Sequence, residues 1–154
     1  MNKTCSIVTG MLLLVIGGGI YKFIFQGSVS DSTDGRSAIH LNSSERDIVL
    51  AEMRAFLASM QQITKGIAEK DMQLVAESAR KVGKAAQGEV PGTLIGKLPI
   101  AFKQLGSDTH ARFDQLAMDA ETLGDENHAL TQLSELMQNC VACHAGHRIA
   151  VIKE

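Results

Sequence analysis

From residue 44 to the end of the chain, apolar residues recur every three or four positions, the spacing that places them on one face of a helix. Four such runs can be separated. The first is preceded by two serines that can cap a helix, Ser43 and Ser44, and carries Val49, Met53, Phe56, Met60, Ile63 and Ile67. The second ends at the sequence GEVPG, residues 88–92, and carries Met72, Val75, Ala79, Val82 and Ala86.

The third and fourth runs occupy the second half of the chain. Pro99 suits the first turn of the third helix, whose inner face is predicted to carry Phe102, Leu105, Thr109, Phe113, Leu116, Ala120 and Leu123. After the sequence GDEN, residues 124–127, the fourth helix is predicted to turn inward Leu130, Leu133, Met137, Cys140, His144, His147 and Val151. No alternating β-branched run indicates a strand. We therefore predict an all-α fold, an antiparallel four-helix bundle over residues 44–154.

The first 25 residues have a different pattern, because residues 5–25 contain a single charge, Lys22. A membrane-spanning helix needs about 20 apolar residues, and the segment reaches that length only if Lys22 extends to the membrane surface. A run that stops at Ile20 instead fits the apolar core of a secretory signal peptide. A membrane anchor and a cleaved signal both stay open, and both export the rest of the chain.

Residues 26–43 are rich in Ser, Asp and Gly and show no period, which predicts a flexible tether between the N-terminal segment and the bundle. The length, net charge and aromatic content of the chain limit the functions that it can have. A chain of 154 residues is long enough for one domain, and a net charge of −2 does not favour a nucleic-acid partner. With 4% aromatic residues and no Trp, the core is thin unless a large apolar group fills part of it. No motif of a hydrolase or a nucleotide-binding loop occurs, so we do not expect an enzyme.

The sequence CVACH, residues 140–144, carries the most specific chemistry in the chain. On one helical face, two thiols three positions apart can attach a haem while the adjacent His144 binds its iron, the c-type haem signal. A redox dithiol is disfavoured because such a pair needs a helix N-terminus to stabilise the thiolate. A zinc site is disfavoured because one straight helix cannot surround a tetrahedral ion. A structural disulfide would leave His144 without a role.

With Cys140, Cys143, His144, His147 and Arg148 on the last helix of a bundle, the chain resembles the class II c-type cytochromes, the cytochrome c prime family. The resemblance covers about residues 45–150, and His147 stands where that family usually carries Tyr or Phe. The stretch THARFDQLAMDAETL, residues 109–123, is also similar to a helix of four-helix b-type cytochromes. The resemblance implies one covalent haem c, with thioethers from Cys140 and Cys143 and His144 as proximal iron ligand.

The resemblance leaves the sixth iron ligand open. Six-coordinate members of the family place a Met from the first helix there, and this position favours Met53 as a ligand, with a plain core residue as the alternative. Members without that ligand bind nitric oxide or carbon monoxide. His110 is the rival ligand, but it lies one position off the inward face, so we expect it to be partly exposed or hydrogen-bonded. Arg54 and Arg148 are candidates to pair with the haem propionates, although either can equally be solvated.

We therefore expect an exported monohaem cytochrome that carries single electrons between a redox-protein donor and acceptor. If the N-terminal helix is kept, the protein is anchored on the periplasmic side of a bacterial inner membrane; if it is cleaved, the protein is soluble in the periplasm. The alternatives are a five-coordinate binder or sensor of nitric oxide or carbon monoxide and a haem relay subunit of a membrane complex. Two copies can also form a homodimer, as family members often pair through their first helices.

Overall fold

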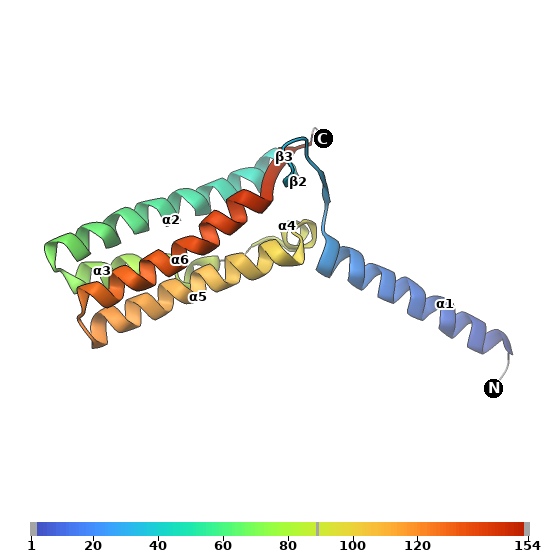
Figure 1. The fold of residues 1–154 in the computed structure, drawn as a ribbon. Helices are drawn as coiled ribbons and strands as arrows, with labels where there is room; N and C mark the ends of the chain where they lie inside the picture. The colour runs from blue at the N-terminus through green and yellow to red at the C-terminus, as the bar shows by residue number, and fades with distance from the viewer. Residues whose placement is uncertain (1–2, 89, 153–154) are drawn as a thin grey trace.

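The computed structural model describes residues 3–88 and 90–152, and this part of the chain is mostly helical (Figure 1). An apolar helix, α1 (Lys3–Ile20), continues into a π-helical segment, η1 (Tyr21–Gln26). The longer helices that follow are α2 (Ser43–Glu69), α3 (Met72–Arg80), α5 (Ile100–Thr122) and α6 (Glu126–Gly146). Between α3 and α5 lie a 3₁₀ turn, η2 (Lys84–Gln87), and the short helix α4 (Gly92–Lys97).

The helices α2, α3, α5 and α6 pack against one another around the main core. In Figure 1 they lie side by side, and consecutive members of this set of four run in opposite directions. The buried side chains between them include Phe56, Ile63, Val75, Phe113, Leu116, Leu133 and Leu136. The predicted apolar spacing is thus confirmed for most of the first three helices. Ala86, Leu123, Leu130 and Met137 were wrongly assigned to the inner faces and are exposed, whereas Ala129 and Leu136 are buried. The second helix also ends earlier than predicted, at Arg80, and Ala86 lies in the turn η2.

Polar side chains cap the first turns of α2 and α6. The Asn42 side chain accepts a hydrogen bond from the Glu45 backbone N–H (2.9 Å), and the Glu45 carboxylate accepts one from the Asn42 N–H (3.0 Å). This reciprocal cap satisfies two backbone donors that a helix start leaves free. The helix therefore begins one residue earlier than the pattern predicts, with Asn42 as its cap in place of Ser43 or Ser44. At the start of α6, the Asp125 side chain accepts one hydrogen bond from the His128 backbone N–H (3.0 Å).

Three short strands form a sheet that the sequence pattern did not predict. They are β1 (Val29–Asp31), β2 (Ser37–Leu41) and β3 (His147–Val151), in the order β1-β2-β3. The β1–β2 pair is antiparallel, whereas β2 and β3 are parallel, with Ser37 opposite His147. The prediction of a purely helical chain was therefore wrong, and so was the extension of the last helix through His147 and Val151, because α6 ends at Gly146.

The sheet covers a second apolar cluster at one end of the helices. Ile39 and Leu41 of β2 are fully buried there against Val49, Leu94 and Leu98. The segment predicted to be a tether thus contains two strands, one of which contributes to the core.

The first 24 described residues, Lys3–Gln26, form a helix long and apolar enough to cross a membrane, with a mean hydropathy of 1.9 and no buried residue. In Figure 1 this helix projects away from the other elements. A helix of this length fits a bilayer core of about 30 Å, and a signal peptide meets the same criteria. An N-terminal apolar helix is therefore confirmed, with both of its predicted roles open.

Candidate functional site

A cavity of about 590 Å³ lies between α2, α5 and the last turns of α6. This volume falls within the range of pockets that hold small organic ligands and cofactors. Most of the wall is apolar: the lining includes Leu50, Met53, Phe56, Leu57, Met60, Phe102 and Leu105, together with Cys140, Cys143 and His144 of α6. The structure thus brings Cys140, Val141, Cys143 and His144 of the CVACH motif to one hydrophobic cavity.

The motif forms the α6 wall of this cavity. Cys140 and Cys143 are partly buried free thiols, and His144 is exposed at the cavity edge. Burial raises the pKa of both thiols, and the Cys140 thiol adds to the effect on Cys143. Since a catalytic dithiol needs a readily formed thiolate, this environment disfavours thiol–disulfide exchange.

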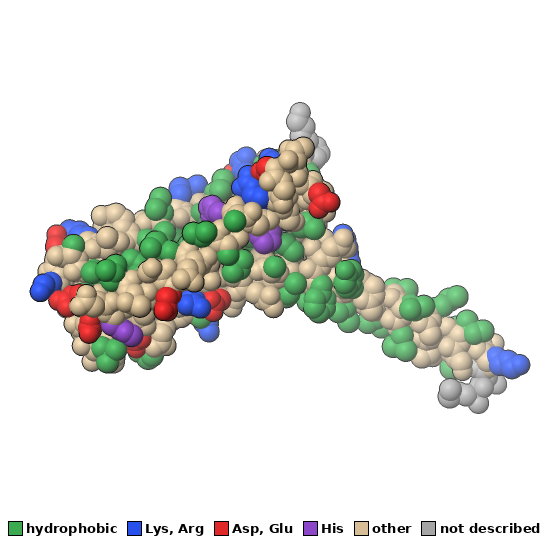
Figure 2. All heavy atoms as spheres, in the orientation of Figure 1, with side chains coloured by type: hydrophobic (Ala, Val, Ile, Leu, Met, Phe, Trp, Pro, Cys, Tyr) green, Lys and Arg blue, Asp and Glu red, His purple; other side chains and the backbone are tan. Residues whose placement is uncertain are grey.

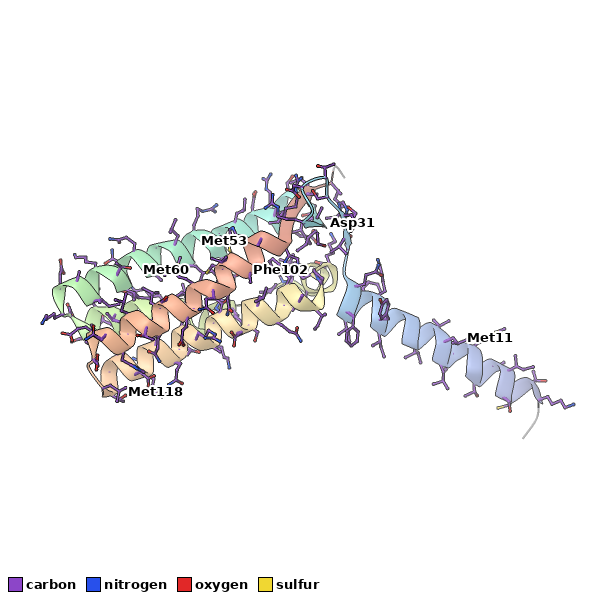
Figure 3. The ribbon with its side chains drawn as sticks, viewed as in Figure 1. Met11, Asp31, Met53, Met60, Phe102 and Met118 are labelled. Carbon is purple, nitrogen blue, oxygen red and sulfur yellow. The ribbon has the colours of Figure 1, made fainter. Side chains whose placement is uncertain are left out.

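The α2 wall contains two methionines that face the same cavity, Met53 and Met60. Figure 3 shows both on α2, and Phe102 at the start of α5. Met53 is partly buried and packs against both apolar clusters, whereas Met60 packs against the main core only. The thioether of a methionine is a soft, flexible group. Both of these thioethers share one cavity with the two thiols and the imidazole of α6.

The two arginines proposed at the site lie in different places. Arg54 is on α2 and lines the cavity. Arg148 belongs to β3, does not line the cavity, and donates a hydrogen bond to the Ser32 hydroxyl (3.0 Å). The structure therefore brings Arg54 to the candidate site and does not bring Arg148 there.

His110 is placed differently from the expectation, because it is 2% exposed. Its Nδ1 lies 2.8 Å from the Val82 carbonyl oxygen and its Nε2 lies 3.1 Å from a Glu52 carboxylate oxygen. The ring also packs against Phe56, with centroids 4.9 Å apart. Burial alone would lower the pKa of His110, but hydrogen bonds to Glu52 and to the Val82 carbonyl raise it. The predicted hydrogen bonding is confirmed, and the predicted partial exposure was wrong.

His110 lines a second cavity, of about 480 Å³, on another side of α2, and not the cavity of the CVACH motif. Glu52 lines both cavities. With both ring nitrogens engaged, His110 is a structural residue that links α5 to α2 and to the end of α3. Glu52 was not singled out from the sequence, since a charged residue beside the apolar stripe gives no sign of its buried partner.

Two residues near the motif were also missed. Arg36, in the loop before β2, donates a hydrogen bond to the His144 carbonyl oxygen (3.4 Å). Asn139 lines the cavity and donates to Asp108 (2.7 Å) of α5. Both depend on contacts between distant segments, which the local sequence pattern does not contain.

Past the motif, the His147 ring meets the Phe102 ring edge-on, with centroids 5.7 Å apart. Among the residues that the structure describes, no group of three or more His, Cys, Asp or Glu side chains is arranged to hold a metal ion. Cys140, Cys143 and His144 lie on α6, whereas His147 is the first residue of β3. No family model, curated protein or solved structure matches this chain.

Proposed function

We propose that this protein is an exported, membrane-anchored monohaem c-type cytochrome that carries single electrons. The observation that supports the proposal best is the lining of the 590 Å³ apolar cavity by Cys140, Cys143 and His144 together. The proposal includes the finer fold assignment, in which α2, α3, α5 and α6 make the antiparallel four-helix bundle of the class II c-type cytochromes.

The residues present fit a haem. Cys140 and Cys143 supply thiols for the two thioether bonds, and His144 supplies an imidazole to the iron. When bound, the haem contributes an iron that changes valence, which no side chain can do. The apolar side chains of α2 and α5 exclude water and keep the local dielectric low, so that nearby charges and ligands have a strong effect on the iron's potential.

We assign the sixth iron ligand to Met53. It lies on the α2 wall of the cavity shared with His144, and His110 is disfavoured because both of its ring nitrogens are hydrogen-bonded. Met60 lies two helical turns further along α2 and is assigned to the core. Arg54 is the candidate partner of a propionate, whereas Arg148 would first have to leave Ser32.

One observation favours a second function. The same α2 wall contains Leu50 and Leu57, which cannot ligate iron. If one of these side chains faces the iron in place of Met53, the protein is a five-coordinate binder of nitric oxide or carbon monoxide. The role of relay subunit in a membrane complex stays a third proposal, since it depends on α1 alone.

The absorption spectrum of the full-length protein, produced with a c-type haem maturation system, tests these proposals. A narrow α band after dithionite reduction, unchanged by carbon monoxide, is expected for an electron carrier. A broad band that shifts with carbon monoxide supports the gas-binding function instead. The Cys140→Ala, Cys143→Ala double variant is the control, and a wild-type protein without covalent haem would refute both functions.

A further inference from the structure

The junction between the N-terminal helix and the rest of the chain is closely packed. The Lys103 ammonium of α5 donates hydrogen bonds to the carbonyl oxygens of Phe23 (3.1 Å) and Ile24 (3.2 Å). The Ser28 backbone N–H donates to the Lys97 carbonyl oxygen (2.7 Å). These bonds satisfy carbonyl groups that the end of a helix leaves free. They connect η1 to α5, and the residues just after η1 to the end of α4.

Gly27 makes this close approach sterically feasible. It has a φ of 69°, and a Cβ atom built on it would lie 2.4 Å from the Lys97 carbonyl oxygen. A side chain at this position would be strained by its backbone conformation and would also collide with the α4–α5 connection. The apolar helix therefore leaves the other helices in a direction that the packing fixes, and not through a free hinge at residue 27.

Apolar side chains gather on the outside of this junction. Tyr21, Phe23, Phe25 and Ile95 are between 45% and 64% exposed, and we call this group the docking face. Tyr21 stacks on Phe25, with ring centroids 6.3 Å apart, and Phe23 adjoins Gly96 of α4. Figure 2 shows hydrophobic side chains collected where the projecting helix meets the body of the molecule.

We propose that the docking face lies in the headgroup region of the bilayer that α1 spans, so that α4 rests on the membrane surface. The inference depends on the anchoring part of the proposed function and is independent of the haem. The occupant is a lipid surface because the docking face continues directly from the spanning helix. Aromatic rings with one polar end, such as Tyr21, and basic side chains, such as Lys22 and Lys103, are the groups that occupy membrane interfaces.

This placement has a consequence for the candidate site. Lys103 is next to Phe102, which lines the cavity, and the α5 wall of the cavity extends to Thr109. At 1.5 Å per residue, Thr109 is only about 9 Å further along α5 than Lys103. The cavity is then held close to the bilayer, and a partner that exchanges electrons with it is expected to be a membrane protein.

Photo-cross-linking of the full-length protein in phosphatidylcholine–phosphatidylglycerol nanodiscs tests the inference. A benzophenone amino acid replaces Ile95 in one variant and Leu123 in the matched control, since Leu123 is 61% exposed at the other end of α5. We expect the mass of one lipid to be added at position 95 and none at position 123. Adducts at neither position, or equally at both, would overturn the proposal.

A second pair of variants tests the packing at the junction. Lys103→Met removes the hydrogen bonds to Phe23 and Ile24, and Lys84→Met, on the exposed turn η2, is its control. The lipid adduct at position 95 is expected to decrease in the first variant alone, and equal adducts in both would contradict a fixed junction. The intact mass and the haem spectrum of the same samples distinguish this proposal from the proposed function. If the mature chain lacks residues 1–25, the membrane docking proposed here is overturned. If a lipid adduct forms on a protein without haem, only the cytochrome function is overturned.

Discussion

The carboxylate of Glu45 is buried where α2, α4 and the second apolar cluster meet, with 6% of the residue exposed. Its two oxygens accept hydrogen bonds from the Lys97 ammonium at 2.7 and 2.6 Å, and one also accepts from the Asn42 N–H. Glu45→Gln keeps the volume and removes the charge, so Lys97 loses its counter-ion, while the Gln carbonyl oxygen can still accept from the Asn42 N–H. Breaking a fully buried ion pair costs about 3–5 kcal/mol. Because the Lys97 side chain is 30% exposed, we expect a loss of about 2 kcal/mol in the free energy of unfolding.

Urea unfolding of the full-length protein in mild detergent, followed by circular dichroism, measures this loss. Glu69→Gln is the matched control, since Glu69 is 58% exposed and its contact with Lys65 is 3.9 Å. A loss below about 0.5 kcal/mol, the range of ordinary surface substitutions, would refute the reasoning.

The same variant has a predicted pH dependence. Burial alone would raise the pKa of Glu45, but Lys97 and the Asn42 N–H lower it below its ordinary value of 4.5. A carboxyl group with a lowered folded-state pKa contributes stability that is complete above its unfolded pKa and is lost as the pH falls through the folded pKa. The difference between wild type and Glu45→Gln should therefore be largest near neutral pH and decrease below pH 4.5. A difference that grows in acid would contradict the assignment.

Three further predictions follow from the site and the core. Met53→Leu should make the reduced haem spectrum sensitive to carbon monoxide, whereas Met60→Leu should not; equal responses would reject Met53 as the ligand. Because the pKa of His110 is raised from 6.5, its pairing with Glu52 should stabilise the fold below that pH and lose effect as the pH rises through the folded pKa; urea titrations of His110→Gln should lack this dependence. Phe113→Ala, at a fully buried position, should cost about 3–5 kcal/mol of unfolding free energy, and a loss under about 1 kcal/mol would show that the core packs otherwise.

The long helices were predictable because the apolar spacing and the helix-start residues that indicate each one lie within or next to it in the sequence. Val49, Phe56 and Ile63 repeat at helical spacing and are buried in α2, and Pro99 directly precedes α5. The error at the end of α6 has a physical cause. The helical spacing of three and four residues continues through His147 and Val151 in the sequence. These residues nevertheless belong to β3, which pairs with β2, more than a hundred residues earlier in the chain. Such long-range parallel pairing leaves no local period to detect.

The candidate site shows the same division between local and distant information. Cys140, Cys143 and His144 share a cavity because they share a helix, and their spacing alone was enough to place them together. Arg148 was a candidate for the site because the last helix was predicted to continue past it. In the structure it belongs to β3 and donates a hydrogen bond to Ser32. His110 seemed exposed because it lies one position off the apolar stripe, but the Val82 carbonyl and Glu52 satisfy both ring nitrogens and permit its burial.

The sheet also explains how a motif so near the C-terminus is held in place. The last turn of a helix leaves carbonyl groups without partners. Here the His144 carbonyl oxygen accepts a hydrogen bond from the Arg36 guanidinium (3.4 Å). Immediately afterwards, β3 pairs with β2 from His147 to Val151, so the chain beyond the motif cannot unravel without breaking the sheet. Because β2 follows β1 and the packed junction at Gly27, the end of α6 is connected through one small sheet to the N-terminal apolar helix.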